Sequence, residues 1–284
     1  MWPSPGAKAL IVLFHGAINR DNRTYPEFLE YRAGVHRHAH QIAIADPSLA
    51  LSEKLSNGWF AGATGTQLQK LLPPFLARLI EHLQVDRVIF AGSSGGGFAA
   101  LYYSWQFPDS TAVVAVPQTN VHQYYESRRT AYLEASWPAE INAPQGSTTP
   151  CLDLRTIYST GMRNTVVYIQ SNMDLFHVEN HMTPFVSALP SSAVKRLILK
   201  CSFWGKLSHS GAVPVQEMDA WIRAVLSADE QTTESISMAY HLTNPGVAPS
   251  PSMSKQNTDR GTPPKALDPI DQQWTAKIAS EMLR

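Results

Sequence analysis

Short apolar runs recur along the chain between Ala9 and Leu226, separated by longer segments of mixed polarity. The runs are continuous and rich in aliphatic and β-branched residues, which is typical of strands buried on both faces of a sheet. They predict strands over 9–14, 41–45, 87–91, 111–116, 165–170 and 194–201.

The intervening segments carry apolar residues at helical spacing, most clearly over 66–83, 98–107 and 215–226. Pro73-Pro74 is expected to kink the first of these helices or to start a new one. Alternation of strands and helices predicts an α/β fold with a doubly wound, mostly parallel sheet in a domain spanning residues 1–227.

The alternation lapses between residues 118 and 160, where tyrosines, a tryptophan and arginines gather. We interpret this segment as a partly helical insertion that covers the site; a surface helix whose aromatics pack on the body is an equal alternative. Residues 228–266 are rich in Ser, Thr, Pro and Asn and predict a flexible linker. An amphipathic helix is expected over 267–284; docking on its own domain is favoured over contact with a partner or a membrane.

Composition narrows the possible functions. The formal net charge is zero, so no overall field favours nucleic acid or an anionic membrane. The apolar run 9–14 is too short for a membrane span and has no signal-peptide cleavage region, so a cytoplasmic location is the default expectation. Cys151 and Cys201 lack the spacing of metal ligands.

The third predicted strand runs into a glycine-rich turn and then an apolar helix. Gly92, Ser94 and Gly96 fill the pattern G-x-S-x-G of a nucleophile elbow, in which small flanking residues let a strained serine project above the sheet. Ser93 is the rival nucleophile, but Ala91 stands two residues before it. A turn that binds phosphate or nothing is the alternative, although neither a P-loop lysine nor G-x-G-x-x-G is present.

An activated serine needs a base, and the base needs an orienting group. Asp174 follows the fifth predicted strand and His209 follows the sixth, so both are expected at the carboxyl edge of the sheet with Ser94. Asp153 and Glu179 are alternative acids.

A metal site is a weaker alternative for the same region. Asp174, His177 and His181 follow one another at helical spacing and include ligand types that zinc accepts. The hypothesis of a metal site would leave His209 and the elbow unexplained.

The order Ser94, Asp174, His209 over residues 9–226 resembles the α/β-hydrolase superfamily, in a minimal form that lacks the first strand pair. The resemblance implies that Ser94 is the nucleophile, His209 the general base and Asp174 the orienting acid. It further implies an oxyanion hole built from Gly95 and Ala17, with Gly16 as second choice, because His15-Gly16 is similar to the His-Gly motif of lipases and esterases.

These features predict a serine esterase that acts on a carboxylic ester through an acyl-enzyme, with no cofactor and no metal. Candidate substrate-binding residues are His15, Trp59, Tyr124 and Tyr125, and the glycine-flanked Trp59 suits a pocket wall or a sugar-stacking surface, unless it is buried in a turn. The expected partner is a small-molecule or glycan acyl substrate. An acyltransferase or deacetylase acting on a glycan or other alcohol is the first alternative, and a catalytically inert binding module is the second.

Overall fold

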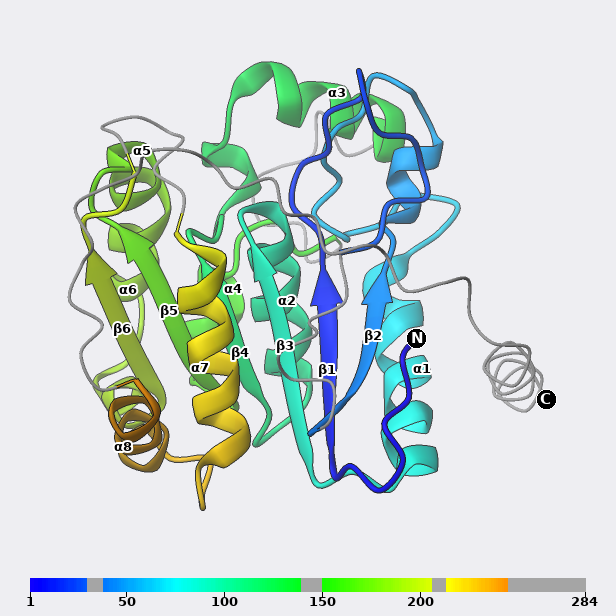
Figure 1. Ribbon diagram of the computed structural model, residues 1–284. Helices are drawn as coiled ribbons and strands as arrows, with labels where there is room; N and C mark the ends of the chain where they lie inside the picture. Colours follow the sequence, from blue (N-terminus) through cyan, green and yellow to red (C-terminus); the bar gives the residue numbers. More distant parts are fainter. Residues whose placement is uncertain (30–37, 139–149, 206–212, 245–284) are drawn as a thin grey trace.

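The computed structural model describes residues 1–29, 38–138, 150–205 and 213–244. Within them, a parallel sheet has the strand order β2-β1-β3-β4-β5-β6, which confirms the predicted doubly wound α/β class (Figure 1). The strands are β1 (Ala9–Phe14), β2 (His40–Ile44), β3 (Arg87–Ser93), β4 (Thr111–Ala115), β5 (Thr165–Ser171) and β6 (Leu197–Ser202). Strand β6 begins later than expected because a 3₁₀ helix, η6 (Ser191–Arg196), precedes it.

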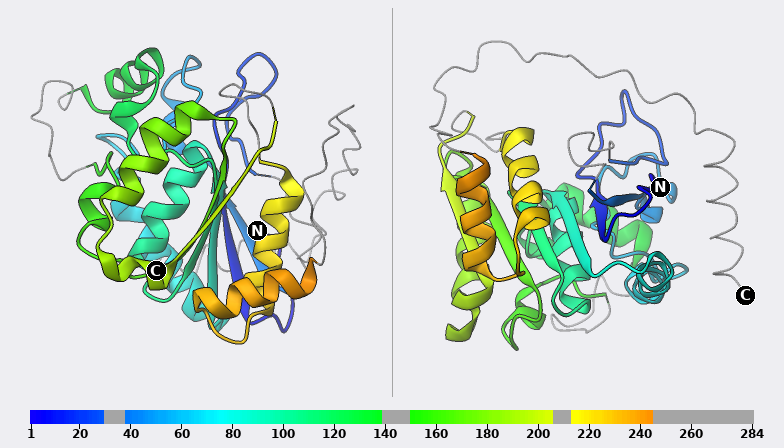
Figure 2. Two further views of the ribbon diagram at one scale, coloured as in Figure 1. Left: turned by 90° about the vertical axis from the view of Figure 1, so that its left-hand side faces the viewer. Right: turned by 60° about the horizontal axis from the view of Figure 1, so that its bottom comes forward.

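Helices cover both faces of the sheet (Figures 1 and 2). Alternate residues of a strand point to opposite faces, and β1 accordingly sends Leu10 and Val12 into one core cluster and Ile11 and Leu13 into the other. The first face is covered by α1 (Leu68–Leu83), α2 (Gly95–Gln106) and α6 (Thr183–Ser187), and the second by α7 (Val215–Ser227) and α8 (Thr233–Thr243).

The proline pair neither ends nor restarts the first helix, so the expectation of a new helix there is wrong. Helix α1 runs through Pro73 and Pro74 as one element, held to the core by Leu72, Leu76 and Leu79. Pro74 lies on the exposed side. Backbone carbonyls left without an N–H partner on that side can be hydrated, so apolar burial on the opposite side keeps the helix continuous.

Residues 228–266 are not a flexible linker throughout, because 233–243 form α8. Tyr240 stacks on Trp221 of α7 with ring centroids 3.9 Å apart, and its hydroxyl donates to Glu217 Oε1 at 2.8 Å. Trp221 Nε1 donates to the same oxygen at 3.0 Å. A few buried anchors therefore order a segment whose overall composition is polar. The helix expected over 267–284 lies outside the described residues.

The segment between β4 and β5 contains η3 (Val121–Gln123), α3 (Glu126–Ser136) and α4 (Arg155–Tyr158) in its described part. Helix α3 lies over the carboxyl ends of the strands, as Figure 1 shows. Its aromatics also pack on the body, because the hydroxyl of buried Tyr132 donates to Gly62 O at 2.8 Å. The described part of the segment is thus partly helical and lies above the sheet, and Tyr132 packs in the core, whereas Tyr125 is 40% exposed.

The chain winds away from β1 in two directions, toward β2 on one side and toward β3 and the later strands on the other. Phe14, the last residue of β1, pairs with Gly92 of β3. The loops that follow these two strands are therefore neighbours at the point where the winding reverses, and doubly wound sheets bind ligands at this place. On its outer edge β2 forms one antiparallel bridge, between Gln41 and Trp2.

Candidate active site

Ser94 stands alone between the end of β3 and the first residue of α2, with φ 53° and ψ −119°. A non-glycine residue in this region is strained by about 1–3 kcal/mol, and the strain persists only where the surroundings impose it. Ser94 occupies the N-cap position of α2, but its side chain makes no capping hydrogen bond. The hydroxyl is thus held above the helix N-terminus and is not used to cap it.

The glycines of the elbow are required by close backbone packing. A Cβ on Gly92 would lie 2.5 Å from the carbonyl carbon of Gly96, and a Cβ on Gly96 would lie 2.5 Å from His15 O. Real Cβ atoms essentially never approach backbone atoms so closely. The turn can therefore close, and α2 can abut the end of β1, only because both positions lack side chains.

The loop after β1 lies beside the serine. A Cβ placed on Gly16 would be 3.8 Å from Ser94 Cβ, and the loop is pinned by Ile18 N, which donates to Ser56 O at 2.8 Å. In the described part of the chain no hydrogen bond engages the N–H of Gly95 or of Ala17. The first of these N–H groups belongs to the first residue of α2, directly after Ser94, and the second lies on the loop after β1.

His15 is a structural residue rather than a pocket-lining one, so its assignment to substrate binding does not fit. The ring is only 4% exposed. Its Nδ1 contacts Gly16 O at 2.7 Å, and its Nε2 accepts a hydrogen bond from Asp46 N at 3.3 Å. The imidazole therefore ties the loop after β1 to the loop after β2.

Trp59 is fully buried, so the interpretation of this loop as an exposed sugar-stacking surface is wrong. The indole packs edge-on between Tyr124 and Tyr132, at centroid distances of 5.8 and 5.2 Å. Trp59 and Phe60 have positive φ, and the turn is held by buried Asp46, which accepts from Phe60 N at 2.8 Å. Burial raises the pKa of the Asp46 carboxyl, and hydrogen bonds from the backbone N–H groups of Phe60 and Ser48 oppose the rise.

Gln118, which the sequence analysis did not single out, contacts the nucleophile directly. It follows β4, is fully buried, and donates from Nε2 to Ser94 Oγ at 2.9 Å. Its backbone N–H also donates to Ser94 O at 3.1 Å. Its position in the sequence could have indicated this role, because a polar residue just beyond a buried strand lies at the edge of the sheet where ligands bind.

Asp174 lies at the carboxyl end of the sheet as expected, three residues after β5, and begins the short helix α5 (Leu175–His177). It is 1% exposed. One carboxylate oxygen accepts from His177 N at 3.1 Å, and the other lies 2.8 Å from His177 Nδ1. His209 lies outside the described residues.

The structure also describes the residues of the alternative metal site and the alternative acid Asp153. No group of three potential metal-ligating side chains is gathered within the part of the chain that the structure describes, so Asp174, His177 and His181 do not form such a cluster there. Asp153 is engaged by Arg155, whose Nε donates to its two oxygens at 2.9 and 3.0 Å. His181 belongs to η5 (Val178–Met182), and its Nδ1 accepts from Thr119 N at 3.3 Å.

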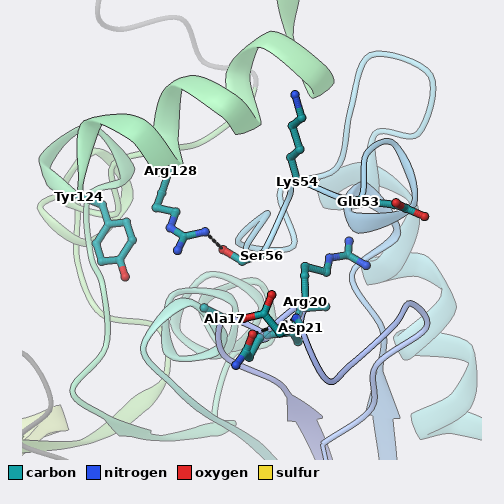
Figure 3. A pocket seen from close by; sticks show the side chains of 10 residues that line it. Ala17, Arg20, Asp21, Glu53, Lys54, Ser56, Tyr124 and Arg128 are labelled. Carbon is teal, nitrogen blue, oxygen red and sulfur yellow. Dashed lines mark hydrogen bonds between the residues drawn. The ribbon is translucent and has the colours of Figure 1, made fainter.

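A polar pocket of about 560 Å³ opens beside the loop after β1 (Figure 3). It is lined by residues 17–21, by residues of the 53–56 segment and by Tyr124 and Arg128 of the insertion. Arg128 points into it and donates to Ser56 Oγ at 2.9 Å. Tyr125 is 40% exposed and stacks on Phe176 at 4.6 Å. Of the four candidate substrate-binding residues, only Tyr124 lines this pocket.

No protein-family model matches the chain, and no curated protein matches it. Solved structures do match over most of its length. The capsule O-acetyltransferase of Neisseria meningitidis serogroup A is 12% identical, with a TM-score of 0.52 over 78% of this chain and 88% of that one. A mutant of that acetyltransferase in complex with CoA gives a TM-score of 0.54 at 12% identity, over 78% and 89%.

An S-formylglutathione hydrolase from Agrobacterium tumefaciens is 16% identical, with a TM-score of 0.53 over 78% of this chain and 83% of that one. At such identities the likeness establishes the fold. The chain has the α/β-hydrolase fold, as the order of its motifs implied. No helix among the described residues is long and apolar enough to cross a bilayer.

Proposed function

We propose that this protein is a serine-dependent acyl hydrolase that cleaves a carboxylic ester through an acyl-enzyme on Ser94. The observation that carries the proposal is the backbone of Ser94. Its positive φ places a hydroxyl that does not cap the helix at the N-terminus of α2, next to Gly95 and near the loop that carries Gly16 and Ala17. Strain of this kind at a strand-to-helix turn is typical of a functional residue.

In the proposed reaction, Ser94 Oγ forms a bond to the ester carbonyl carbon while its proton passes to His209. The carbonyl electron pair moves onto oxygen, and the N–H groups of Gly95 and Ala17, with Gly16 as the second choice for the latter, stabilise that charge. The tetrahedral species collapses, the alcohol leaves with the proton from His209, and an acyl-Ser94 ester remains. Water, deprotonated by the same imidazole, then attacks the acyl group and returns Ser94 to its free form.

Asp174 is proposed to orient His209 and to stabilise its protonated form. Its burial supports this role, because a carboxylate shielded from water interacts more strongly with a nearby imidazolium. One carboxylate oxygen of Asp174 also lies 2.8 Å from the Nδ1 of a second imidazole, that of His177. An experiment must therefore decide which of the two histidines is the functional partner of Asp174.

The second candidate is an acyltransferase in which an alcohol or a glycan hydroxyl replaces water. The open polar pocket beside Ala17 favours it, because a second, hydrophilic substrate would need such a space. The similarity in fold to a capsule O-acetyltransferase supports this candidate.

The test is turnover of 4-nitrophenyl esters with short acyl chains, with and without added sugar or glycerol. Ser94→Ala is expected to lower kcat by at least about 10⁴-fold, and Ser93→Ala, which removes the neighbouring hydroxyl, is expected to retain activity. An acylated acceptor among the products would establish the transferase. Absence of turnover and of acyl-enzyme in folded wild type would leave the inert binding module as the better account.

A further inference from the structure

Gln118 is part of a buried hydrogen-bond chain that ends on the reacting atom. Its Oε1 accepts from the indole Nε1 of Trp59, and its Nε2 donates to Ser94 Oγ at 2.9 Å. Asn57 Nδ2 approaches the same Oε1 at 3.4 Å. Gln118 and Trp59 are both fully buried, so solvent does not compete for these bonds.

The chemistry of the partners fixes the orientation of the Gln118 amide. An indole N–H can only donate, so the atom of Gln118 that faces Trp59 must be the oxygen. The NH₂ group must then face Ser94, and Ser94 Oγ must accept. The proton of Ser94 is consequently kept away from Gln118 and is available to a base.

Tyr124 approaches the same amide from the pocket side. Burial raises the pKa of its phenol, and a hydrogen bond with Gln118 is among the influences that oppose the rise. Tyr124 lines the pocket on the side of the insertion (Figure 3). Gln118 thus contacts both the nucleophile and a residue that lines the pocket.

We propose that Gln118 is a catalytic hydrogen-bond donor to Ser94 Oγ, oriented by Trp59; this rests on the proposed function of Ser94. When Oγ loses its proton to the base and bonds to the carbonyl carbon, negative charge develops on Oγ, and the Gln118 N–H stabilises it. When the acyl group later departs, the Oγ–C bond breaks and its electron pair returns to Oγ, so the same donor assists the second step. Hydrogen bonds to charged groups are stronger than those to neutral ones, which makes the effect larger in the transition state than at rest.

The test measures the rate at which a fluorophosphonate probe labels Ser94, because that reaction forms a bond to Oγ without a second substrate. Gln118→Met, which keeps the length of the side chain and removes the donor, is expected to slow labelling by roughly ten- to a hundredfold. Gln69→Met is the matched control. That amide is also bonded at both ends, to the backbone of Cys151, and is expected to leave the rate unchanged.

Gln118→Glu separates the donor role from a merely structural one. Its carboxylate can accept from Trp59 but repels charge on Oγ, whereas its protonated form can donate to Oγ. The labelling rate relative to wild type is therefore expected to rise as the pH falls from about 9 to about 5, through the range in which a buried glutamate takes up a proton. A structural role predicts a ratio that does not change with pH.

Both variants are checked for folding by circular dichroism and thermal unfolding. If folded Gln118→Met and Gln118→Glu label Ser94 at the wild-type rate across this pH range, the role of Gln118 is overturned while the proposed function stands. If wild type itself is not labelled at Ser94, the proposed function fails, and the role of Gln118 fails with it.

Discussion

The two sides of the candidate site are built by different means. The nucleophile side, formed by residues 16–17 and 92–96, is set by the backbone: by the pairing of Phe14 with Gly92 and by glycines that leave no room for a Cβ. The acid–base side, formed by residues 174–177, is set by one buried carboxylate and the groups that bond to it. A site fixed by backbone geometry has one arrangement, whereas a carboxylate can accept more than one imidazole.

This difference has a practical consequence for how the two sides respond to mutation. On the nucleophile side, a methyl group added to a glycine should reduce the stability of the fold more than the removal of a hydroxyl does. No side-chain rotation can relieve a clash between Cβ and the backbone. On the acid–base side, changes of charge or hydrogen bonding should affect turnover more than folding.

The largest effect is expected from Gly96→Ala. The new Cβ would meet His15 O at about 2.5 Å, so either α2 or the end of β1 must shift. We expect a loss of about 4 kcal/mol or more in the free energy of unfolding, measured by urea denaturation, together with loss of Ser94 labelling. Gly65→Ala is the control, because a Cβ there has no atom within 4 Å. Equal stabilities of the two variants would contradict the backbone-set description.

The next effect concerns the partner of Asp174. Asp174→Asn is expected to lower kcat by about 10³-fold or more, because an amide does not stabilise the protonated imidazole of His209. His177→Gln keeps a donor near Asp174 and is expected to change kcat by less than about tenfold. Steady-state kinetics on both variants decide between the histidines. A loss in His177→Gln as large as that in Asp174→Asn would make His177 the functional partner and remove His209 from the scheme.

The smallest effect on stability and turnover is expected on the face of the sheet that α7 and α8 cover. Tyr240→Phe removes the hydrogen bond from α8 to buried Glu217 and is expected to cost about 1 kcal/mol of stability without changing turnover. Leu242→Ala, at a position 74% exposed on the same helix, is expected to change neither. Chemical denaturation and ester kinetics on the same samples provide the comparison. A change in kcat for Tyr240→Phe would link α8 to one side of the site.

The sequence predicted the features that depend on local pattern. Continuous apolar runs such as 9–14 and 165–170 marked buried strands, and G-x-S-x-G placed Ser94 at a strand-to-helix turn. These predictions held because a strand buried on both faces has little choice of composition, and because the elbow admits only small residues at its flanks.

Features that depend on packing were not predictable in the same way. The glycines that flank Trp59 left an exposed and a buried indole both open, and two tyrosines from a distant segment enclose it. Helix α8 was hidden in a Ser- and Thr-rich stretch because only a few of its residues, chiefly Ile236 and Tyr240, are anchored in the core. Gln118 carried no motif, since its contact with Ser94 arises from the turn after β4.

The most direct test of the central claim is to locate the adduct of a fluorophosphonate probe by mass spectrometry of peptides from wild type and Ser93→Ala. The account predicts one adduct on Ser94 in both proteins, since the strained elbow presents that hydroxyl and not its neighbour. An adduct that maps to Ser93 and is lost in Ser93→Ala, or no adduct on the folded wild-type protein, would contradict it.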